Sequence, residues 1–572
     1  MNYRENYERW LASEKVDEAS KAELRAIADD DEEIKFRFVK GLEFGTGGLR
    51  GTMVAGTNAM NVYTVAHATQ GLADLINKEG KADRGVAIAH DSRNNSPLFA
   101  KTAASVLAAN GVKVKIFNGV RPTPVLSFAV RELGTIAGIN ITASHNPKQY
   151  NGYKAYWEDG AQLPPDHAKT VSEFIAAADI FDDVKLIDFE EGVKSGIIEW
   201  IPEEFDERYI KNVLAEAVNP EVVAKVADDL EIVYTPLHGA GYKMVPEVLR
   251  RLGIKHIDTV DEQMVLDGNF PTTAFPNPEY PEVFTLGIKL AEKVGSDLII
   301  ATDPDADRVG IMSRDKNGEF KCLTGNQVGA LLLDYIITAY EETGMPENPY
   351  AVKTIVSTEM VTKICEAHNI KLHNVLTGFK FIGEVIKKYE TTGHDNYIFG
   401  FEESYGYLKG TYARDKDSVV ASMLLCEMAA YYKTKNMTLC DAMDALYERY
   451  GCFFEGTANI YMEGLDGIEK MKALMDRLRS NPPADLAGYR VIERRDYLLD
   501  TVLDVDTGKV TSTGLPTSNV LYFKTEANDV IIIRPSGTEP KIKIYILTNG
   551  KDMDEVNAKI AAYDKITDTW VE

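Results

Sequence analysis

The chain has 572 residues, which at about 150 residues per domain corresponds to roughly four domains. Hydrophobic residues make up 45% and charged residues 26%, an ordinary composition for a globular protein. The formal net charge of −25 argues against nucleic acid or an anionic membrane as a partner, because both bind a basic face.

The cysteines and the first residues predict a cytoplasmic protein without export signals. The five cysteines include no Cys-x-x-Cys pair and are odd in number, which indicates reduced thiols rather than a disulfide framework. The segment MNYRENYERW lacks the apolar core of a signal peptide. No run approaches ~18 apolar residues, so we expect no membrane span.

The first part of the chain, to about residue 40, has the pattern of charged amphipathic helices. Its apolar positions at helical spacing are Leu24, Ile27, Ile34 and Phe38. The glycine-rich segment FGTGGLRG at 44–51 follows. Glycines let a backbone approach a phosphate, and the Arg50 guanidinium could bind its oxygens. A plain glycine turn is an equal interpretation of this segment taken alone.

Three segments, 85–117, 231–257 and 351–375, share one pattern of strand, polar loop, helix and second strand. The helices are expected to end at Gly or Asn, as C-capping predicts. Strand–helix–strand units form parallel sheets, so we predict three related α/β domains in series. The loop Gly119–Pro124 between two of these elements could direct Arg121 into a cleft.

The apolar run Ile136–Ile141 predicts a buried strand, and TASHNP follows it. The Ser144 hydroxyl and the His145 imidazole would then lie at the carboxyl end of a strand, where open α/β sheets bind ligands. Lys148 and Lys154 follow closely. A serine beside a histidine and cations suggests a nucleophile or a phosphate carrier. The alternative is that Ser144 and Asn146 only cap the next helix.

Further along, the apolar strand 298–301 leads into Asp303, Asp305 and Asp307 of TDPDADR. Three alternating carboxylates form a hard-oxygen site suited to Mg²⁺. A solvated acidic turn is the alternative. Because three uncompensated carboxylates at one strand end repel one another, a cation is favoured.

Later loops carry groups that suit a sugar phosphate. Lys380 lies in TGFK, and Glu402 and Glu403 lie in GFEESYG, where carboxylates could accept bonds from sugar hydroxyls. Arg414-Asp-Lys-Asp417 could be a surface charge cluster. Near the C-terminus, the strand–loop–strand segment from Asp529 contains RPSGTEPK at 534–541, which has the chemistry of a phosphate cradle. This last region lacks the strand–helix–strand repeat and is predicted to be an α+β domain.

Taken together, these segments resemble the α-D-phosphohexomutase superfamily, in its phosphoglucomutase-like branch. The matching motifs are FGTGGLRG, TASHNP with the downstream YNGYK, DPDADR, GFEESYG and RPSGTEPK. They occur in the family's order from Phe44 to Lys541 and so span nearly the whole chain. Each motif alone is modest evidence, whereas all of them in order form a highly specific pattern.

The resemblance implies a heart-shaped protein of four domains, three related α/β domains followed by a smaller α+β domain. The expected domains are 1–205 with the N-terminal helices and the phosphoserine loop, 206–318 with the metal loop, 319–445 with the sugar loop, and 446–572 with the phosphate loop.

The resemblance also implies residue roles. Ser144 matches the serine that carries the phosphoryl group, and with Asp303, Asp305 and Asp307 it would bind Mg²⁺. The residues expected to assist transfer are Arg50, His145, Lys154 and Lys416, the last matching a candidate proton-transfer lysine of one branch. The residues expected to bind substrate are Arg308, which also matches a transfer-assisting position, Thr377, Gly378, Lys380, Glu402, Ser404, Arg534, Ser536, Gly537 and Thr538.

The implied activity is a phosphoglucomutase reaction, the interconversion of α-D-glucose 1-phosphate and glucose 6-phosphate with glucose 1,6-bisphosphate as intermediate. The sugar loop lacks the histidine-bearing form typical of phosphomannomutase/phosphoglucomutase enzymes, which favours glucose over mannose. Mannose and pentose phosphates stay open as substrates, as does a monomer or a dimer. Two rival hypotheses are a phosphohydrolase with Asp303 as nucleophile and Asp305 as acid, and a sugar-phosphate sensor without turnover.

Overall fold

The computed structural model describes residues 2–45, 47–462, 467–536 and 541–571. The chain forms two compact units. The first unit comprises residues 1–323, 383–393 and 405–438, and the second comprises 324–382, 394–404 and 439–572. The chain therefore passes between the units repeatedly, after residues 323, 382, 393, 404 and 438.

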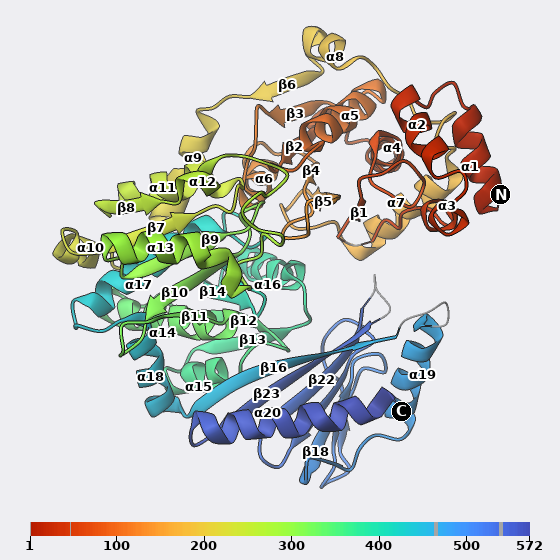
Figure 1. The fold of residues 1–572 in the computed structure, drawn as a ribbon. Helices are drawn as coiled ribbons and strands as arrows, with labels where there is room; N and C mark the ends of the chain where they lie inside the picture. Colours follow the sequence, from red (N-terminus) through yellow and green to blue (C-terminus); the bar gives the residue numbers. More distant parts are fainter. Residues whose placement is uncertain (1, 46, 463–466, 537–540, 572) are drawn as a thin grey trace. The chain divides into compact units, whose positions relative to one another are not determined.

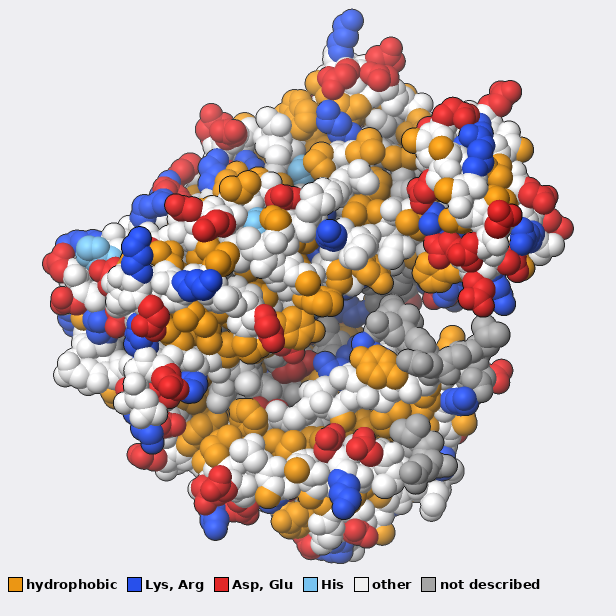
Figure 2. All heavy atoms as spheres, viewed as in Figure 1, with side chains coloured by type: hydrophobic (Ala, Val, Ile, Leu, Met, Phe, Trp, Pro, Cys, Tyr) orange, Lys and Arg blue, Asp and Glu red, His pale blue; other side chains and the backbone are white. Residues whose placement is uncertain are grey.

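The N-terminal segment folds as the predicted amphipathic helices (Figure 1). They are α1 (Tyr3–Ala12), α2 (Glu18–Ala26) and α3 (Asp31–Phe38). Their apolar faces enclose Trp10, whose ring packs edge-on against Phe38, Tyr63 and Phe181. Charged side chains, many of them acidic, cover the outer face of these helices (Figure 2). The apolar faces thus attach the segment to the remainder of the first unit.

The first sheet has six strands in the order β1-β5-β4-β2-β3-β6. Its strands are β1 (Leu49–Thr52), β2 (Val86–His90), β3 (Val114–Phe117), β4 (Ala137–Ile141), β5 (Tyr150–Trp157) and β6 (Ile198–Ile201). The accompanying helices are α4 (Val62–Lys78), α5 (Ser96–Ala109), α6 (Thr123–Glu132), α7 (Pro165–Ala177) and α8 (Phe189–Ser195). Strand β4 is buried along its whole length, as its apolar run predicts.

The second sheet, also in the first unit, has five strands in the order β11-β10-β9-β7-β8. They are β7 (Glu231–Thr235), β8 (His256–Thr259), β9 (Leu298–Thr302), β10 (Val309–Arg314) and β11 (Phe320–Leu323). Its helices are α9 (Phe205–Ala215), α10 (Glu221–Val226), α11 (Gly241–Leu252), α12 (Asp261–Met264) and α13 (Thr285–Val294). Helix α17 (Ser418–Lys433) packs on α10 and α11 of this unit.

The second unit begins with a parallel sheet whose strands pair in the order β13-β12-β14. These are β12 (Pro349–Thr354), β13 (Lys371–Val375) and β14 (Asn396–Glu402). Helices α14 (Gly325–Thr343), α15 (Met360–Ala367) and α18 (Leu439–Tyr450) also belong to this unit. Helix α16 (Phe379–Thr392) begins in this unit and continues into the first, and β15 (Gly406–Leu408) belongs to the first unit.

The predicted strand–helix–strand repeats are confirmed in all three sheets. Strand β2 pairs in parallel with β3 and β4, β7 with β8 and β9, and β12 with β13 and β14. In each of the first two sheets one further strand pairs in antiparallel fashion with the outer parallel strand: β5 pairs with β4, and β10 pairs with β9. The parallel strands therefore bring loops that are far apart in sequence to equivalent sheet edges.

The C-terminal sheet is mostly antiparallel, as expected for an α+β region, and runs β16-β23-β22-β21-β18-β19-β20, with β17 beside β18. Its strands are β16 (Cys452–Tyr461), β17 (Asp485–Leu486), β18 (Tyr489–Asp496), β19 (Thr501–Asp504), β20 (Val510–Thr511), β21 (Leu521–Thr525), β22 (Val530–Pro535) and β23 (Lys541–Gly550). Helices α19 (Gly467–Ser480) and α20 (Met553–Asp568) complete it.

Both faces of the C-terminal sheet are buried, because apolar residues alternate between two cores. Ile531 and Ile533 face the core that the residues of α19 and α20 share. Val530 and Ile532 face a second core, together with Ile355 from the segment that precedes α15. Figure 1 shows α20 lying along one face of this sheet.

The five cysteines are all free thiols. Within the described ranges, no helix combines the length and the apolar character that crossing a bilayer requires.

Replacement of Trp10 by Ala would remove the centre of the N-terminal aromatic cluster. The side chain is 1% exposed, so the loss of packing and the cavity left behind are expected to cost about 3–5 kcal/mol. Native-state hydrogen exchange of α1–α3 peptides would measure this loss. The matched control is Phe36→Ala, since Phe36 is 51% exposed on α3. Equal exchange in both variants would contradict the packing role.

Glu455 on β16 predicts a pH-dependent stability. Its Oε1 atom is buried and lacks a hydrogen-bond partner among the described residues. Burial raises the pKa of Glu455 from 4.5 to about 7, although Thr358, Lys353 and Asn326 act in the opposite direction. The folded state then binds more protons than the unfolded state across this window. The free energy of unfolding should therefore fall as the pH rises through it, by up to about 3 kcal/mol.

Glu455→Gln removes this titration, so its stability relative to the unmodified protein should increase from pH 4.5 to pH 7 and then level off. Urea unfolding at several pH values would measure the difference. The exposed residue Glu469 offers the control Glu469→Gln. A difference independent of pH would show that the Glu455 carboxyl titrates normally.

Candidate active site

Ser144 lies in the loop after β4, in a backbone conformation that non-glycine residues rarely adopt. Its φ is 52°, and its N–H donates to Thr142 Oγ1 at 2.8 Å. The Ser144 hydroxyl donates to Asp303 Oδ2 at 2.8 Å and lies 3.1 Å from His145 Nδ1. The next element is strand β5, so the helix-capping interpretation of Ser144 is wrong. Such strain is typically retained at functional sites.

A buried arginine that the sequence analysis missed holds this loop. Arg93, in the loop after β2, is 1% exposed. Its guanidinium donates to four loop carbonyls, those of Ser144, Asn146, Pro147 and Tyr150. It is paired with Asp91 at 3.2 Å. The parallel pairing of β2 with β4 places the two loops at one sheet edge, which is the signal that could have identified Arg93.

The motif YNGYK forms the start of β5, which runs between β1 and β4. A Cβ at Gly152 would lie 2.4 Å from the Thr142 carbonyl oxygen, so only glycine allows this approach. Lys154 and Tyr156 follow at alternate positions and therefore point to the same face of the sheet.

The three predicted metal-binding aspartates lie together in the loop after β9, and all are buried. Asp303 Oδ1 accepts bonds from the N–H groups of Asp307 and Arg308, both at 3.1 Å. Each of the three carboxyl groups offers an oxygen within 4.8 Å of the others. The loop thus gathers three negative charges beside the Ser144 hydroxyl.

This donor set fits a divalent cation. Asp305 Oδ1 and Asp307 Oδ1 are buried and have no hydrogen-bond partner among the residues that the structure describes. Buried carboxylate oxygens without a donor are costly unless a cation binds them. Three clustered carboxylates are the ligand type that Mg²⁺ prefers. The aspartate cluster can therefore hold a metal ion.

Two lysines balance the carboxylates from the other side. Lys154 Nζ lies 2.7 Å from Asp305 Oδ2 and 3.1 Å from Asp307 Oδ2. Lys416 Nζ lies 3.2 Å from Asp307 Oδ2 and 3.0 Å from Asp415 Oδ1. Lys416 and Asp415 are buried, so Arg414–Asp417 is not a surface charge cluster. The Tyr156 hydroxyl donates to Asp415 Oδ2 at 2.8 Å and so holds the partner of Lys416.

Burial and charge shift the pKa values in this cluster. Burial, with the neighbouring charges of Asp305 and Asp307, raises the pKa of Asp303 well above its usual value. Burial also acts on Asp305 in that direction, but the charge of Lys154 outweighs it and the pKa of Asp305 is lowered. Burial opposes the charge of Lys154, yet Asp305 and Asp307 raise its pKa, so Lys154 stays protonated.

Arg50, His145 and Arg308 complete the predicted group around Ser144. Arg50 donates to Asn146 Oδ1 at 3.0 Å, which brings the glycine-rich segment beside the Ser144 loop. Arg308 Nε lies 3.9 Å from Asp307 Oδ1. Burial and the charges of Arg308 and Arg50 hold the pKa of His145 well below its usual value, so its ring is neutral. The first unit therefore brings together the predicted catalytic and metal-binding residues.

Thr123 is a second residue that the sequence analysis missed. Its N–H donates to the Asp305 carbonyl and its hydroxyl donates to Asp305 Oδ2 at 2.7 Å. The Asn140 amide donates in turn to Thr123 Oγ1. The loop Gly119–Pro124 was singled out for Arg121, but that side chain is paired with Asp206 at 2.8 Å instead. Only tertiary contact identifies Thr123, since a threonine in a proline-flanked loop has no distinctive pattern.

In the second unit, the two predicted sugar-binding segments meet. Glu402 is buried at the end of β14, and its Oε1 accepts the N–H of Gly378 at 2.8 Å. Gly378 has φ 117°, a conformation that favours glycine. Lys380 is the second residue of α16, and its ammonium lies over the Phe381 ring. Thr377 and Ser404 are half-buried in these two loops.

The predicted phosphate loop begins where β22 ends. Arg534 Nη1 donates to the Tyr545 hydroxyl at 3.4 Å, and Ser536 N–H bonds the Lys541 carbonyl. Burial and the charges of Glu403 and Glu402 raise the pKa of Tyr545, and Arg534 opposes this. Tyr545 thus lies within electrostatic range of the predicted sugar loop, through Glu402 and Glu403, and of the predicted phosphate loop, through Arg534. Gly537 and Thr538 lie outside the described residues.

Comparison with known proteins places the chain in a family. Models of phosphoglucomutase/phosphomannomutase alpha/beta/alpha domains I, II and III match residues 41–180, 207–318 and 324–450. A phosphoglucomutase of Staphylococcus aureus (strain N315) is 36% identical over 550 residues, covering 96% of this chain and 97% of that protein.

Two solved structures are similar in fold. Parafusin, a Paramecium phosphoglucomutase in its open form, has a TM-score of 0.68 at 18% identity and covers 93% of this chain and 94% of its own. An Aspergillus fumigatus N-acetylphosphoglucosamine mutase has a TM-score of 0.50 at 13% identity, with 93% and 96% covered. The chain therefore belongs to the phosphoglucomutase/phosphomannomutase family of the α-D-phosphohexomutase superfamily, and it is an isomerase that transfers phosphoryl groups.

Proposed function

We propose that the chain is a phosphoglucomutase that interconverts α-D-glucose 1-phosphate and glucose 6-phosphate, with Ser144 as the phosphoryl carrier. The observation that carries this proposal is the position of the Ser144 hydroxyl, 2.8 Å from Asp303 in a buried cluster of carboxylates and cations. The 36% identity to a staphylococcal phosphoglucomutase supports the choice of substrate.

Asp303, Asp305 and Asp307 would hold Mg²⁺, with an oxygen of phosphorylated Ser144 as a further ligand. When bound, Mg²⁺ would neutralise charge on the phosphoryl group. The Aspergillus neighbour was solved with GlcNAc-6P and magnesium, which supports both ligand classes here. Thr123 and Lys154 would hold Asp305 in place, because both contact its Oδ2 atom.

In the forward direction, the phosphoryl group would pass from Ser144 Oγ to the free 6-hydroxyl of glucose 1-phosphate. The bond from phosphorus to Oγ breaks, a bond from phosphorus to the sugar oxygen forms, and the sugar hydroxyl proton moves to a protein base and from there to Oγ. Lys416 and His145 are the candidates for that base, and the protonated Lys154 would contribute its positive charge. Arg50, which contacts Asn146 in the Ser144 loop, and Arg308, which lies beside Asp307, would stabilise the transferring charge.

The product of this step is glucose 1,6-bisphosphate, which must present its other phosphate to Ser144. The Ser144 hydroxyl then attacks that phosphorus and its proton can pass to His145, whose neutral Nδ1 lies 3.1 Å away. The bond from phosphorus to the 1-oxygen breaks, that oxygen takes up the proton held by His145, and glucose 6-phosphate leaves. Ser144 is phosphorylated again, so the cycle balances.

The loops of the second unit would bind the remainder of the sugar phosphate. Glu402 and Ser404 would bind sugar hydroxyls, aided by Thr377, Gly378 and Lys380. The Gly378 N–H bond holds the Glu402 carboxylate in one orientation. Arg534 and Ser536, with Gly537 and Thr538, would hold the phosphate that is not transferred. A phosphate clamp of this kind supplies binding energy for alignment at the reacting end.

Asp307→Asn should weaken divalent-cation binding by at least about tenfold, because it removes a charged ligand from the cluster. Calorimetric titration with Mn²⁺ as the probe would measure the dissociation constant directly, without reliance on turnover. The exposed Asp229 supplies the matched control Asp229→Asn. Equal affinities in both variants would argue against a metal at the aspartate cluster.

The reaction itself is tested by a product assay with glucose 1-phosphate, Mg²⁺ and a trace of glucose 1,6-bisphosphate. Glucose 6-phosphate should form, and Ser144→Ala should lower kcat by about three orders of magnitude or more. Ser195→Ala on α8 is the control.

Mannose 1-phosphate and ribose 1-phosphate, each with its own bisphosphate, belong in the same assay. If either sugar phosphate turned over faster than glucose 1-phosphate, the proposed mechanism would stand and that sugar would replace glucose as the proposed substrate. Free phosphate that survives Ser144→Ala but not Asp303→Ala would instead support the hydrolase.

A further inference from the structure

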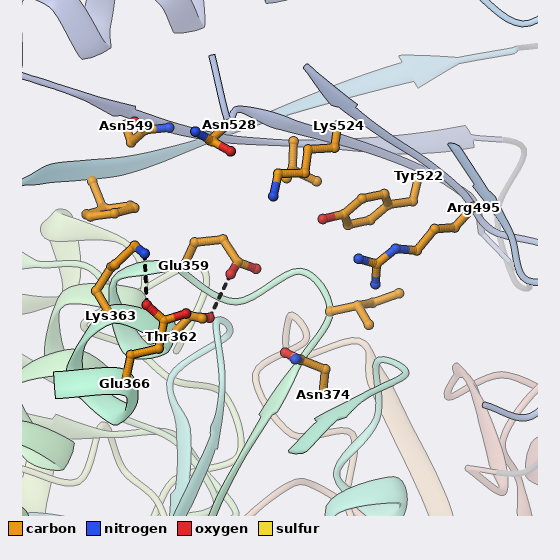
Figure 3. A pocket seen from close by; sticks show the side chains of 13 residues that line it. Glu359, Thr362, Lys363, Glu366, Asn374, Arg495, Tyr522, Lys524, Asn528 and Asn549 are labelled. Atoms are coloured by element: carbon orange, nitrogen blue, oxygen red, sulfur yellow. Dashed lines mark hydrogen bonds and ion pairs between the residues drawn. The ribbon is translucent and has the colours of Figure 1, made fainter. Parts of the chain in front are cut away.

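A cavity lies inside the second unit, and none of the residues that line it is assigned to the reaction. Its volume is about 360 Å³, and it lies between α15 with β13 and one face of the C-terminal sheet. Figure 3 shows Arg495, Tyr522 and Lys524 extending from the sheet on one wall. Residues of the α15 segment and Asn374 form the opposite wall (Figure 3).

The strand register explains why polar groups gather on this face. Arg495 on β18 pairs with Tyr522 on β21, and Glu493 pairs with Lys524. Because side chains alternate along a strand, these four residues share one face, and their neighbours Leu521 and Phe523 point to the other core. The cavity occurs where long polar side chains replace the apolar contacts of this face.

Some hydrogen-bond donors that line the cavity have no acceptor within the described ranges of the chain. Tyr522 is only 5% exposed, yet its hydroxyl has no hydrogen-bond partner within the described ranges of the chain. The Lys524 ammonium has neither a hydrogen bond nor an ion pair within those same ranges, although it lies within electrostatic range of Glu359. The side-chain amide of Asn374, on the opposite wall, also has no hydrogen-bond partner within those ranges, but Asn374 is exposed and its amide can bind water. Of these three residues only Tyr522 is buried, and Lys524 is half-buried.

The acids of the cavity, in contrast, are already engaged. Glu359 accepts bonds from Lys353 at 3.0 Å and from Thr362 at 2.7 Å. Glu366 is paired with Lys363 at 2.8 Å. The guanidinium of Arg495 is likewise paired with Glu493 at 2.7 Å. The cavity groups that have no partner are therefore donors, and the positive charge of Lys524 favours an acceptor with negative charge.

We propose that this cavity binds a small organic anion, with its phosphate or carboxylate oxygens placed among Lys524, Tyr522 and Asn374. The volume lies in the range of small-molecule sites and exceeds what a lone inorganic ion fills. The ligand would touch both walls, so it would join β21 of the C-terminal sheet to β13 of the parallel sheet. Binding is then expected to slow hydrogen exchange in both walls of the cavity.

Calorimetric titration of the full chain with glycerol 3-phosphate, which carries a phosphate and no carboxylate, and separately with citrate, which carries carboxylates and no phosphate, tests the proposal. At least one anion should bind, and tighter binding of one identifies phosphate or carboxylate as the preferred group. Lys524→Gln should weaken binding about tenfold or more, since it removes a charged donor, and Tyr522→Phe about threefold. The exposed Lys509 supplies the matched control Lys509→Gln, which should bind as the unmodified chain does.

Arg534→Gln separates this cavity from the predicted phosphate loop. Anion binding should persist in Arg534→Gln, and hydrogen exchange should slow in peptides 355–375 and 520–530. The proposal is overturned if neither anion binds, or if binding is lost in Arg534→Gln and kept in Lys524→Gln. Should Lys524→Gln fail to fold, Tyr522→Phe and the exchange measurement decide the question alone.

Discussion

The placement of three carboxylates in a buried loop is the constraint on which the first unit depends. Two like charges 4.8 Å apart repel by about 3 kcal/mol or more at an effective dielectric constant near 20. Each pair among Asp303, Asp305 and Asp307 has oxygens within this distance. Because all three residues are buried, water does not screen the repulsion between their charges. The ammonium groups of Lys154 and Lys416 offset this repulsion through ion pairs. The Oδ1 atoms of Asp305 and Asp307 remain available to a cation.

Several structural features serve this arrangement at once. Strand β5 carries Lys154 toward the aspartates, and its Gly152 lets it approach the backbone of the Ser144 loop. Arg93 fixes that loop through four carbonyls, so the Ser144 hydroxyl stays beside Asp303. Tyr156 holds Asp415, which in turn holds Lys416. Removal of any one cation or its support would leave a buried negative charge unbalanced.

Features that depend on local pattern were predictable from the sequence. The buried strand before Ser144, the strand–helix–strand repeats and the aspartate loop all follow from apolar runs and from residues adjacent to them. Arg93 and Thr123 were not predictable in this way, because their importance lies in contacts with loops about 50 and 180 residues away. The roles of Glu402 and Arg534 stay predictions, as do the domain boundaries, because they depend on how the segments act together.

The division of the chain has a consequence for its modularity. The boundary between the units passes after residue 404, inside the motif GFEESYG, so Ser404 and Tyr405 belong to different units. No single cut of the polypeptide yields two contiguous fragments that each contain a whole unit. Recombination or gene fusion at one point therefore cannot exchange one unit for that of a relative. Any evolutionary change in the sugar-binding motif therefore alters residues of two different units.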